Sequence, residues 1–158
     1  MGTRRMSNLT IELLAPDQFR SAYPLIREAM PSLALAGWLR FARQTAAARR
    51  AGRTGIVAAR RPARPYPCGL FCYRVDHDLE KGRVLIAEHF VAVDLLEPAA
   101  VLAALVAELD RLGARLGCNA IRSIVHGTAA DVSGGLIKAG HIAAGTLLFK
   151  SLLGANSG

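Results

Sequence analysis

The sequence predicts a mixed α/β fold, and three features of the 158-residue chain carry this prediction. A valine-rich apolar segment at 83–93 reads as a strand, a helical pattern begins at Pro98, and 120–126 (AIRSIVH) reads as a second strand. Strand, helix and strand in this order form a right-handed parallel crossover. Strand and helix patterns also alternate before this unit. The length suits one domain, so we expect a single domain over 1–158 with an ordered core over about 9–152.

The first third of the chain is predicted to form one strand and two helices. Residues 9–15 (LTIELLA) read as the strand. The helix that opens at Pro16 carries apolar residues at spacings of three and four. It contains Pro24, which should kink or split it. A second helix is expected over about 34–51, and Gly52 is its stop signal.

Three strands and the crossover helix follow. Residues 54–60 read as a strand that ends in a proline-rich turn. The next strand, 68–77, should form a hairpin with 83–93 through the turn DLEKGR. In the helix after Pro98, leucines recur at spacings of three and four until Gly117 ends it.

The last part of the chain is predicted to form a short helix and a final strand. The helix covers about 129–139, where Thr128 and Asp131 have the spacing of a capping box. Gly140 ends it, and 143–152 (AAGTLLFKSL) reads as the strand. So apolar a terminal strand could pair between subunits and form a homodimer.

The net charge of +8 comes from an arginine-rich segment at 40–64 that contains no acidic residue. Such a segment could attract phosphates, nucleic acid or an acidic partner. Aromatic residues are sparse around it, so the stacking that single-stranded nucleic acid requires is missing. We therefore favour a solvated surface over a nucleic-acid site. The arginines of this segment are Arg40, Arg43, Arg49, Arg50, Arg53, Arg60, Arg61 and Arg64.

Several other classes of protein are disfavoured by the sequence. No apolar run reaches the roughly 18 residues of a membrane span. The basic N-terminus is not followed by an apolar segment, so we expect a cytoplasmic protein with no membrane partner. The three cysteines lack metal-ligand spacing and read as reduced thiols, so no metal is expected. Met1 and Met6 both remain candidates for the native start.

The element order β-α-α-β-β-β-α-β-α-β resembles the GNAT superfamily of acyl-CoA N-acyltransferases over about 9–152. Three segments carry the resemblance: FVAVD (90–94) at the end of the fourth strand, the helix start near Pro98, and LIKAGHI (136–142), which is similar to a late motif of the family. The resemblance implies a GNAT-like fold and an N-acyltransferase. It implies acetyl-CoA or another acyl-CoA as co-substrate and an amine of a small molecule or peptide as acceptor.

The chain departs from the family pattern where the coenzyme pyrophosphate would bind. Members carry a Gln/Arg-x-x-Gly-x-Gly/Ala loop there, whose glycines let backbone N–H groups approach the phosphates. Here the matching positions have no glycine, Asp94 and Glu97 add negative charge, and the branched Val101 obstructs the approach. Leu136 also stands where many members carry a Tyr. The resemblance still implies that coenzyme contacts come from Val91, Val93, Ala99, Ala100, Val101, Leu102 and Ala103.

Acyl transfer to an amine requires a base, and three residues are candidates. His89 lies on the fourth strand and has an ordinary pKa of about 6.5, which suits the task. A hydrogen-bonded strand histidine is an equally good interpretation of it. Alternation should place Glu88 on the opposite face from His89, so we expect only one of them to face the cleft. His126, at the end of the next strand, could reach the cleft mouth, although such residues are more often structural.

A second hypothesis belongs to a different class of function. The missing glycines would also be explained by a catalytically inactive GNAT-like module that no longer binds CoA. Such a module would regulate or bind an acidic partner through the arginine-rich 40–64 segment.

Overall fold

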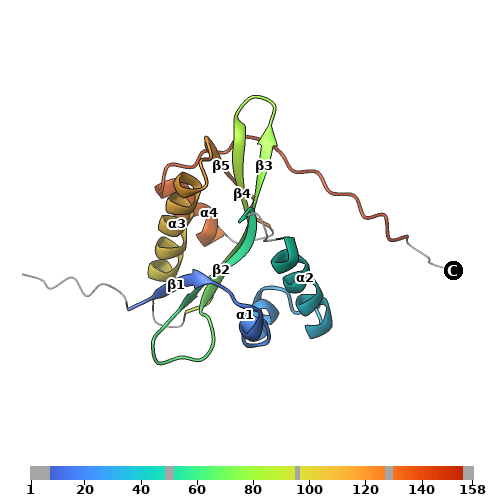
Figure 1. The fold of residues 1–158 in the computed structure, drawn as a ribbon, viewed down its shortest axis with the longest axis vertical. Helices are drawn as coiled ribbons and strands as arrows, with labels where there is room; N and C mark the ends of the chain where they lie inside the picture. Colours follow the sequence, from blue (N-terminus) through green and yellow to red (C-terminus); the bar gives the residue numbers. More distant parts are fainter. Residues whose placement is uncertain (1–7, 49–51, 95–96, 127–129, 155–158) are drawn as a thin grey trace, which may run out of the picture.

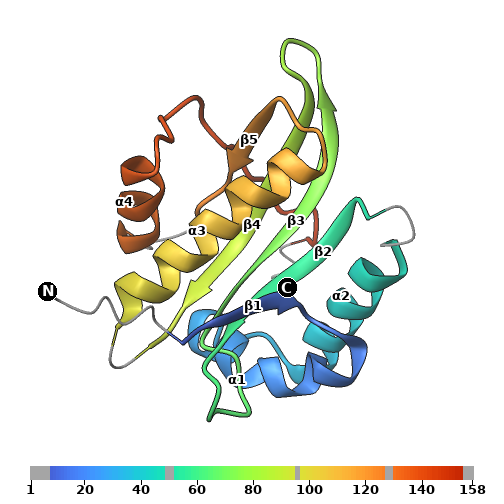
Figure 2. The ribbon, with the colours of Figure 1, turned by 60° about the vertical axis from the view of Figure 1, so that its left-hand side comes forward.

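The computed structural model describes residues 8–48, 52–94, 97–126 and 130–154, and a five-stranded sheet lies at its centre. Neighbouring strands from β1 to β4 pair antiparallel, whereas β4 and β5 pair parallel. The predicted crossover is confirmed, because α3 (Pro98–Arg115) connects the two parallel strands (Figure 2). In sheet order the strands are β1 (Thr10–Leu13), β2 (Thr54–Arg60), β3 (Gly69–Asp78), β4 (Gly82–Ala92) and β5 (Ala120–Ser123).

Helices cover both faces of this sheet (Figure 1). A 3-10 turn, η1 (Pro16–Gln18), leads into α1 (Phe19–Ala29), which lies beside α2 (Leu35–Ala47) on one face. On the other face lies α3, with α4 (Ala130–Lys138) packed against it. No helix in the described part of the chain is long and apolar enough to cross a bilayer.

Strand β2 shows how the sheet is buried from both sides. Ile56 and Ala58 pack with α1 and α2, whereas Val57 and Ala59 pack with α3. All four side chains are buried. A strand that is covered on both faces reads as a continuous apolar run rather than as an alternating one, and the segment TGIVAAR has this character.

The first helix is not split at Pro24, which was one of the two effects that we expected of this proline. The structure has one helix, α1, with Pro24 inside it. Pro24 is exposed, whereas Ala22, Leu25 and Ile26 on the same helix are buried against the sheet. Packing of the apolar face therefore outweighs the single backbone hydrogen bond that a proline removes.

The predicted final strand over 143–152 does not form. Residues 141–154 have no regular secondary structure, and they run away from the body of the protein (Figure 1). The exit direction is fixed at the end of α4, where Gly140 has a φ of 99° and the N–H of His141 donates to the carbonyl of Leu136 at 3.0 Å. This pair of features forms a Schellman motif, which turns the chain out of the helix.

Gly69, at the start of β3, should not tolerate a side chain. A Cβ there would lie 2.7 Å from Val101 Cγ1 and 3.1 Å from the carbonyl oxygen of Val91. Gly69→Ala is therefore expected to lower the free energy of unfolding by about 1–3 kcal/mol in urea denaturation. The matched control is Gly134→Ala in α4, where nothing lies within 4 Å of the added Cβ and the change should be neutral or slightly stabilising. Equal effects would contradict close packing of α3 on β3.

Candidate active site

Strand β4 contains a bulge near the point where it passes the end of β5. Cys72 pairs with Glu88 and Leu70 pairs with Val91, so β4 has one more residue than β3 between these two pairs. His89 lies in this interval with a φ of 58°. A left-handed backbone is uncommon for a residue with a side chain and is a feature of some bulges.

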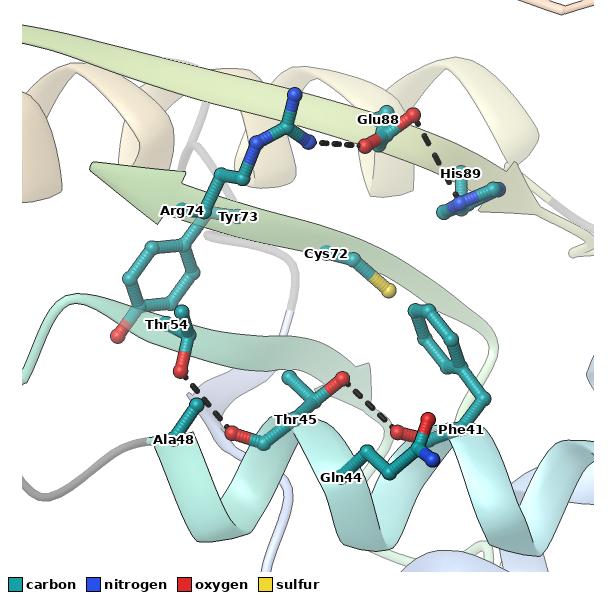
Figure 3. Close-up of a pocket in the computed structure, with 10 residues that line it drawn as sticks. All are labelled: Phe41, Gln44, Thr45, Ala48, Thr54, Cys72, Tyr73, Arg74, Glu88 and His89. Atoms are coloured by element: carbon teal, nitrogen blue, oxygen red, sulfur yellow. Dashed lines mark hydrogen bonds and ion pairs between the residues drawn. The ribbon is translucent and has the colours of Figure 1, made fainter. Parts of the chain in front are cut away.

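The bulge reverses the phase of side-chain alternation along β4. Before it, Leu85 and Ala87 pack with α3, whereas after it Val91 packs with α1 and α2. As a result, Glu88 and His89 line the same pocket, between the sheet and α2 (Figure 3). Our expectation that alternation places these two residues on opposite faces is wrong, because alternation holds only in a strand without an extra residue.

All three residues that the sequence suggested for proton transfer lie in one cluster. The Glu88 carboxylate accepts a hydrogen bond from Arg74 through Oε1. Its other oxygen, Oε2, lies 3.8 Å from His89 Nε2 and 3.5 Å from His126 Nε2. The two imidazole rings stack with their centroids 5.5 Å apart. Glu88 therefore links two histidines and an arginine from three different strands or strand ends.

His126 reaches this cluster because β5 ends beside the bulge. The last parallel pair is Ala87 with Ser123, and the N–H of Ile124 then donates to the carbonyl of Ala87 at 2.8 Å. From Glu88 onward, within the described residues, β4 pairs only with β3. The two parallel strands thus separate at His126 and leave one edge of β4 open.

The pocket beside the cluster has a volume of about 280 Å³ and is formed by α2, β2, β3 and β4 (Figure 3). The rings of Phe41 and His89 meet nearly at right angles, with 5.6 Å between the ring centroids. Trp38, one turn earlier on α2, is core: its Nε1–H donates to the Phe19 carbonyl at 2.7 Å. The remaining lining residues are Gln44, Thr45, Ala48, Thr54, Cys72, Tyr73, Arg74 and Glu88.

The chain matches no protein-family model and no curated protein sequence, but its fold matches solved structures. The aminoglycoside N-acetyltransferase AAC(6')-Iy in complex with CoA has 16% identity and a TM-score of 0.72, and the match covers 94% of this chain and 97% of that one. Glucosamine-6-phosphate N-acetyltransferase from Arabidopsis thaliana has 12% identity and a TM-score of 0.71, with 91% and 98% covered. A transcriptional regulator from Bacillus halodurans has 12% identity and a TM-score of 0.75, with 90% and 99% covered.

The chain has the GNAT fold. The fold class expected from the sequence is thereby confirmed, and its fourth and fifth strands are β4 and β5. The coenzyme contacts that we expected from the resemblance therefore fall at the open edge of β4 and at the first turn of α3.

Two of the residues that we expected to contact the coenzyme, Val91 and Val93, make contacts inside the protein. Val91 is buried among residues of α1 and α2. Val93 is 41% exposed, but its N–H donates to the Cys68 carbonyl at 2.8 Å. Val93 therefore points its amide toward β3, and only its carbonyl and side chain face elsewhere.

The first turn of α3 presents a mixture of exposed and buried residues. Val101 is fully buried and directs Cγ1 toward Gly69, so its branched side chain does not cover the helix N-terminus. Leu102 is also buried, Ala100 is half-buried, and Ala99 and Ala103 are exposed. The branched side chain of Val101, which we expected to obstruct a phosphate, therefore points into the core.

Arg61 compensates for the acidic residues near this helix, and sequence analysis did not single it out. It follows β2 and donates through Nε to Asp94 Oδ2 at 2.9 Å, and its Nη2 contacts the same oxygen. Glu97 Oε2 lies 3.7 Å from Nη2. The negative charge beside α3 is thus shared with a guanidinium, which weakens the repulsion that Asp94 and Glu97 would exert on an anion.

The cluster beside the pocket holds its two central groups in defined protonation states. Burial lowers the pKa of His89 below its usual 6.5, and the charges of His126 and Arg74 lower it further, against the opposing effect of Glu88. Burial by itself would raise the pKa of Glu88, but the Arg74 hydrogen bond, His89 and His126 together bring it below 4.5. Near neutral pH, His89 is therefore a neutral base beside a carboxylate.

The cysteine that lines the pocket is kept protonated by its burial. Burial raises the pKa of Cys72, which lies under the pocket, to about 12, so this thiol stays protonated and a poor nucleophile. Within the described ranges, no group of three His, Cys, Asp or Glu residues could hold a metal ion.

The coupling inside the cluster can be measured by NMR titration of the His89 ring. In the unchanged protein its pKa should lie below 6.5. Glu88→Gln removes the charge that raises this pKa and should lower it further, whereas His126→Asn removes a charge that lowers it and should raise it. Glu80→Gln, at the tip of the β3–β4 hairpin, is the control and should leave it unchanged. Shifts of the opposite sign would contradict the cluster geometry.

Proposed function

We propose that this protein is an N-acyltransferase that transfers an acyl group, such as acetyl, from an acyl-CoA to an amine of a small molecule or peptide. The observation that carries the proposal is the bulge at His89. It brings a neutral histidine and a carboxylate to one pocket beside the open edge of β4, and a second histidine lies next to the same carboxylate. The resemblance to GNAT N-acyltransferases supports the proposal that acyl-CoA binds at that edge.

His89 is the proposed base. Its neutral ring accepts the proton that the acceptor nitrogen loses as it attacks the thioester carbonyl. The Glu88 carboxylate, 3.8 Å away, stabilises the imidazolium that forms. The same imidazolium then donates a proton to the departing thiolate, so the overall reaction of amine and thioester gives amide and thiol. This second step supplies the proton that a tyrosine would give, since the corresponding Leu136 is a buried core residue.

His126 is proposed to share this proton transfer. Its Nε2 lies 3.5 Å from the same Glu88 oxygen that faces His89, and its side chain is 49% exposed. A proton can therefore pass between the cluster and solvent without leaving histidine and carboxylate groups.

The coenzyme is proposed to bind along the open edge of β4 and at the start of α3. The first turn of α3 keeps Ala99 exposed and turns Val101 into the core, so the positive end of the helix dipole remains accessible to a pyrophosphate. Pro98 has no N–H, and the N–H groups of Ala100 and Val101 donate to the Glu97 carbonyl, so the dipole contributes more here than free donors do. Arg61 holds Asp94 and Glu97 and reduces the local negative charge. These features replace part of what a glycine-rich loop supplies.

The acceptor is proposed to occupy the pocket between α2 and the sheet. About 280 Å³ suits a small amine or the terminal residue of a peptide. Phe41 offers an apolar wall next to His89, whereas Gln44 and Glu88 offer polar groups to the amine end.

The arginine-rich segment lends little support to the alternative of a binding module for an acidic partner. Its described arginines are spread over several elements: Arg40 and Arg43 lie on α2, whereas Arg53 and Arg60 lie at opposite ends of β2, about 20 Å apart for a strand of this length. Arg61 is already paired with Asp94.

Substitutions in the cluster should separate the base from the residue that supports it. Thiol release from acetyl-CoA, measured with a panel of amino sugars, polyamines and short peptides, should fall about 100-fold or more in kcat for His89→Ala. Glu88→Gln should lose less, about 10-fold, and move the acidic limb of the pH–rate profile to lower pH because the pKa of His89 falls. Gln44→Ala, on the far wall of the pocket, should change mainly KM. A larger loss in Glu88→Gln than in His89→Ala would reverse the proposed roles.

Coenzyme binding can be tested separately from catalysis. Calorimetry and thermal shift should detect CoA, and ligand at 100 times Kd would stabilise the protein by about 2.7 kcal/mol. Arg61→Ala should weaken CoA binding about 10-fold, because Asp94 and Glu97 then face the phosphates without a counter-charge, while pantetheine binding should change little. Arg64→Ala removes an exposed arginine of the same loop and is the control. No binding at millimolar CoA would refute the enzyme proposal and favour the module.

A further inference from the structure

Arg74 lines the pocket with part of its guanidinium unused. Its Nη1 contacts Glu88 Oε1, and among the described residues its Nε and Nη2 have no hydrogen-bond or ion-pair partner. The side chain is 46% exposed, so these donors are open to a ligand. Nε and Nη2 form one edge of the planar guanidinium fork, and such an edge matches two oxygens of a carboxylate or a phosphate.

The proposed base lines the same pocket as Arg74. Figure 3 shows Arg74, Glu88 and His89 in a row along one wall, across from α2. Arg74 and His89 contact different oxygens of the Glu88 carboxylate. One small molecule in a pocket of about 280 Å³ can therefore contact both of them.

The pocket has no free carboxylate for a second positive charge on the acceptor. Among the described residues that line it, Glu88 is the only acidic one, and Arg74 is already paired with it. Asp76, the next acid on this face of β3, lies outside the lining and accepts the N–H of His77 at 2.8 Å. On α2, the exposed Arg40 lies one turn before a lining residue. These arginines attract a negative group and repel a positive one.

The contacts of Glu88 limit how long the acceptor can be. His89 Nε2 lies 3.8 Å from Oε2, and Arg74 extends from the other oxygen, so at most about 11 Å separates Nε2 from the free nitrogens of Arg74. One hydrogen bond at each end takes up about 3 Å. At most about 5 Å then remains between the amine nitrogen and an anionic oxygen, which two or three carbon atoms can span.

We propose that the acceptor is a short amine that also carries a carboxylate or a phosphate, and that Arg74 binds this anionic group while His89 faces the amine. The anionic group contacts the Nε–Nη2 edge, so it and Glu88 bind different nitrogens of one cation. Arg74 is then a specificity-determining residue in addition to its pairing with Glu88. This inference rests on the proposed acyl transfer and names the class of its acceptor.

Three acceptors of equal length test the preference: β-alanine, its neutral amide β-alaninamide, and the dication of diaminopropane. With acetyl-CoA, kcat/KM should be at least about 10-fold higher for β-alanine than for β-alaninamide, and lowest for diaminopropane. Phosphoethanolamine has a phosphate at the same chain length, and the better of the two anionic acceptors identifies the anion. Equal values for β-alanine and its amide, with phosphoethanolamine no better, would overturn the proposal.

Substitution of Arg74 separates specificity from support of Glu88. Arg74→Gln should bring the kcat/KM values of the preferred anionic acceptor and β-alaninamide to near equality. It should also slow both reactions because Glu88 loses its partner, but a role limited to Glu88 would leave their ratio unchanged. Arg74→Lys keeps the charge without the fork and should retain part of the preference. Arg27→Gln removes an exposed arginine of α1 outside the pocket and should keep the ratio.

Binding without catalysis distinguishes this inference from the proposed function. In NMR titrations without coenzyme, β-alanine or phosphoethanolamine should shift the signals of the Arg74 Nε–H and of the His89 ring, whereas β-alaninamide should leave the Arg74 signal unchanged. These shifts, with no acetylation of any amine, would support the anion site and reject the enzyme. Acetylation of neutral or cationic amines, with no shift at Arg74, would support the enzyme and reject the anion site.

Discussion

The backbone conformation of His89 is the constraint on which the candidate site depends. A positive φ at a residue with a side chain is unfavourable by about 1–3 kcal/mol and persists only where the surrounding structure holds it. Here β4 is paired with β3 on both sides of the bulge, and the closed hairpin cannot slip to remove the extra residue. The result is that two adjacent side chains, Glu88 and His89, face one pocket, while the main chain of β4 turns away from β5. A regular strand would have separated these groups and left no place for both of them.

Two arginines, Arg74 and Arg61, form ion pairs with Glu88 and Asp94 and so provide a counter-charge for these carboxylates. Arg74 binds Glu88, so this carboxylate stays charged although it is three-quarters buried. Arg61 binds Asp94, whose side chain is only 8% exposed. Both pairs lie in or beside the places proposed for substrates, where an uncompensated carboxylate would repel phosphates or carry a proton at neutral pH. The Arg74–Glu88 pair connects β3 and β4 beside the pocket. The Arg61–Asp94 pair connects the ends of β2 and β4 near the start of α3.

The terminal segment shows that the fold of one copy leaves part of its apolar sequence unused. The buried large apolar residues fill two cores, one under α3 and one under α1 and α2.

The sequence by itself determined the fold class, the positions of the five strands of the sheet and of the crossover helix, and the choice of Glu88, His89 and His126 as candidate residues. Periodicity and turn residues are local signals, and they sufficed for these features. Even the pairing of Arg74 with Glu88 could have been found, because the hairpin turn fixes the register that makes them diagonal neighbours. Only the tertiary structure decided that Glu88 and His89 share a face, that Val101 turns inward, and that 143–152 leaves the body of the protein. A bulge, the direction of a buried side chain and the partner of a terminal strand all depend on contacts between segments distant in sequence, and no local pattern contains them.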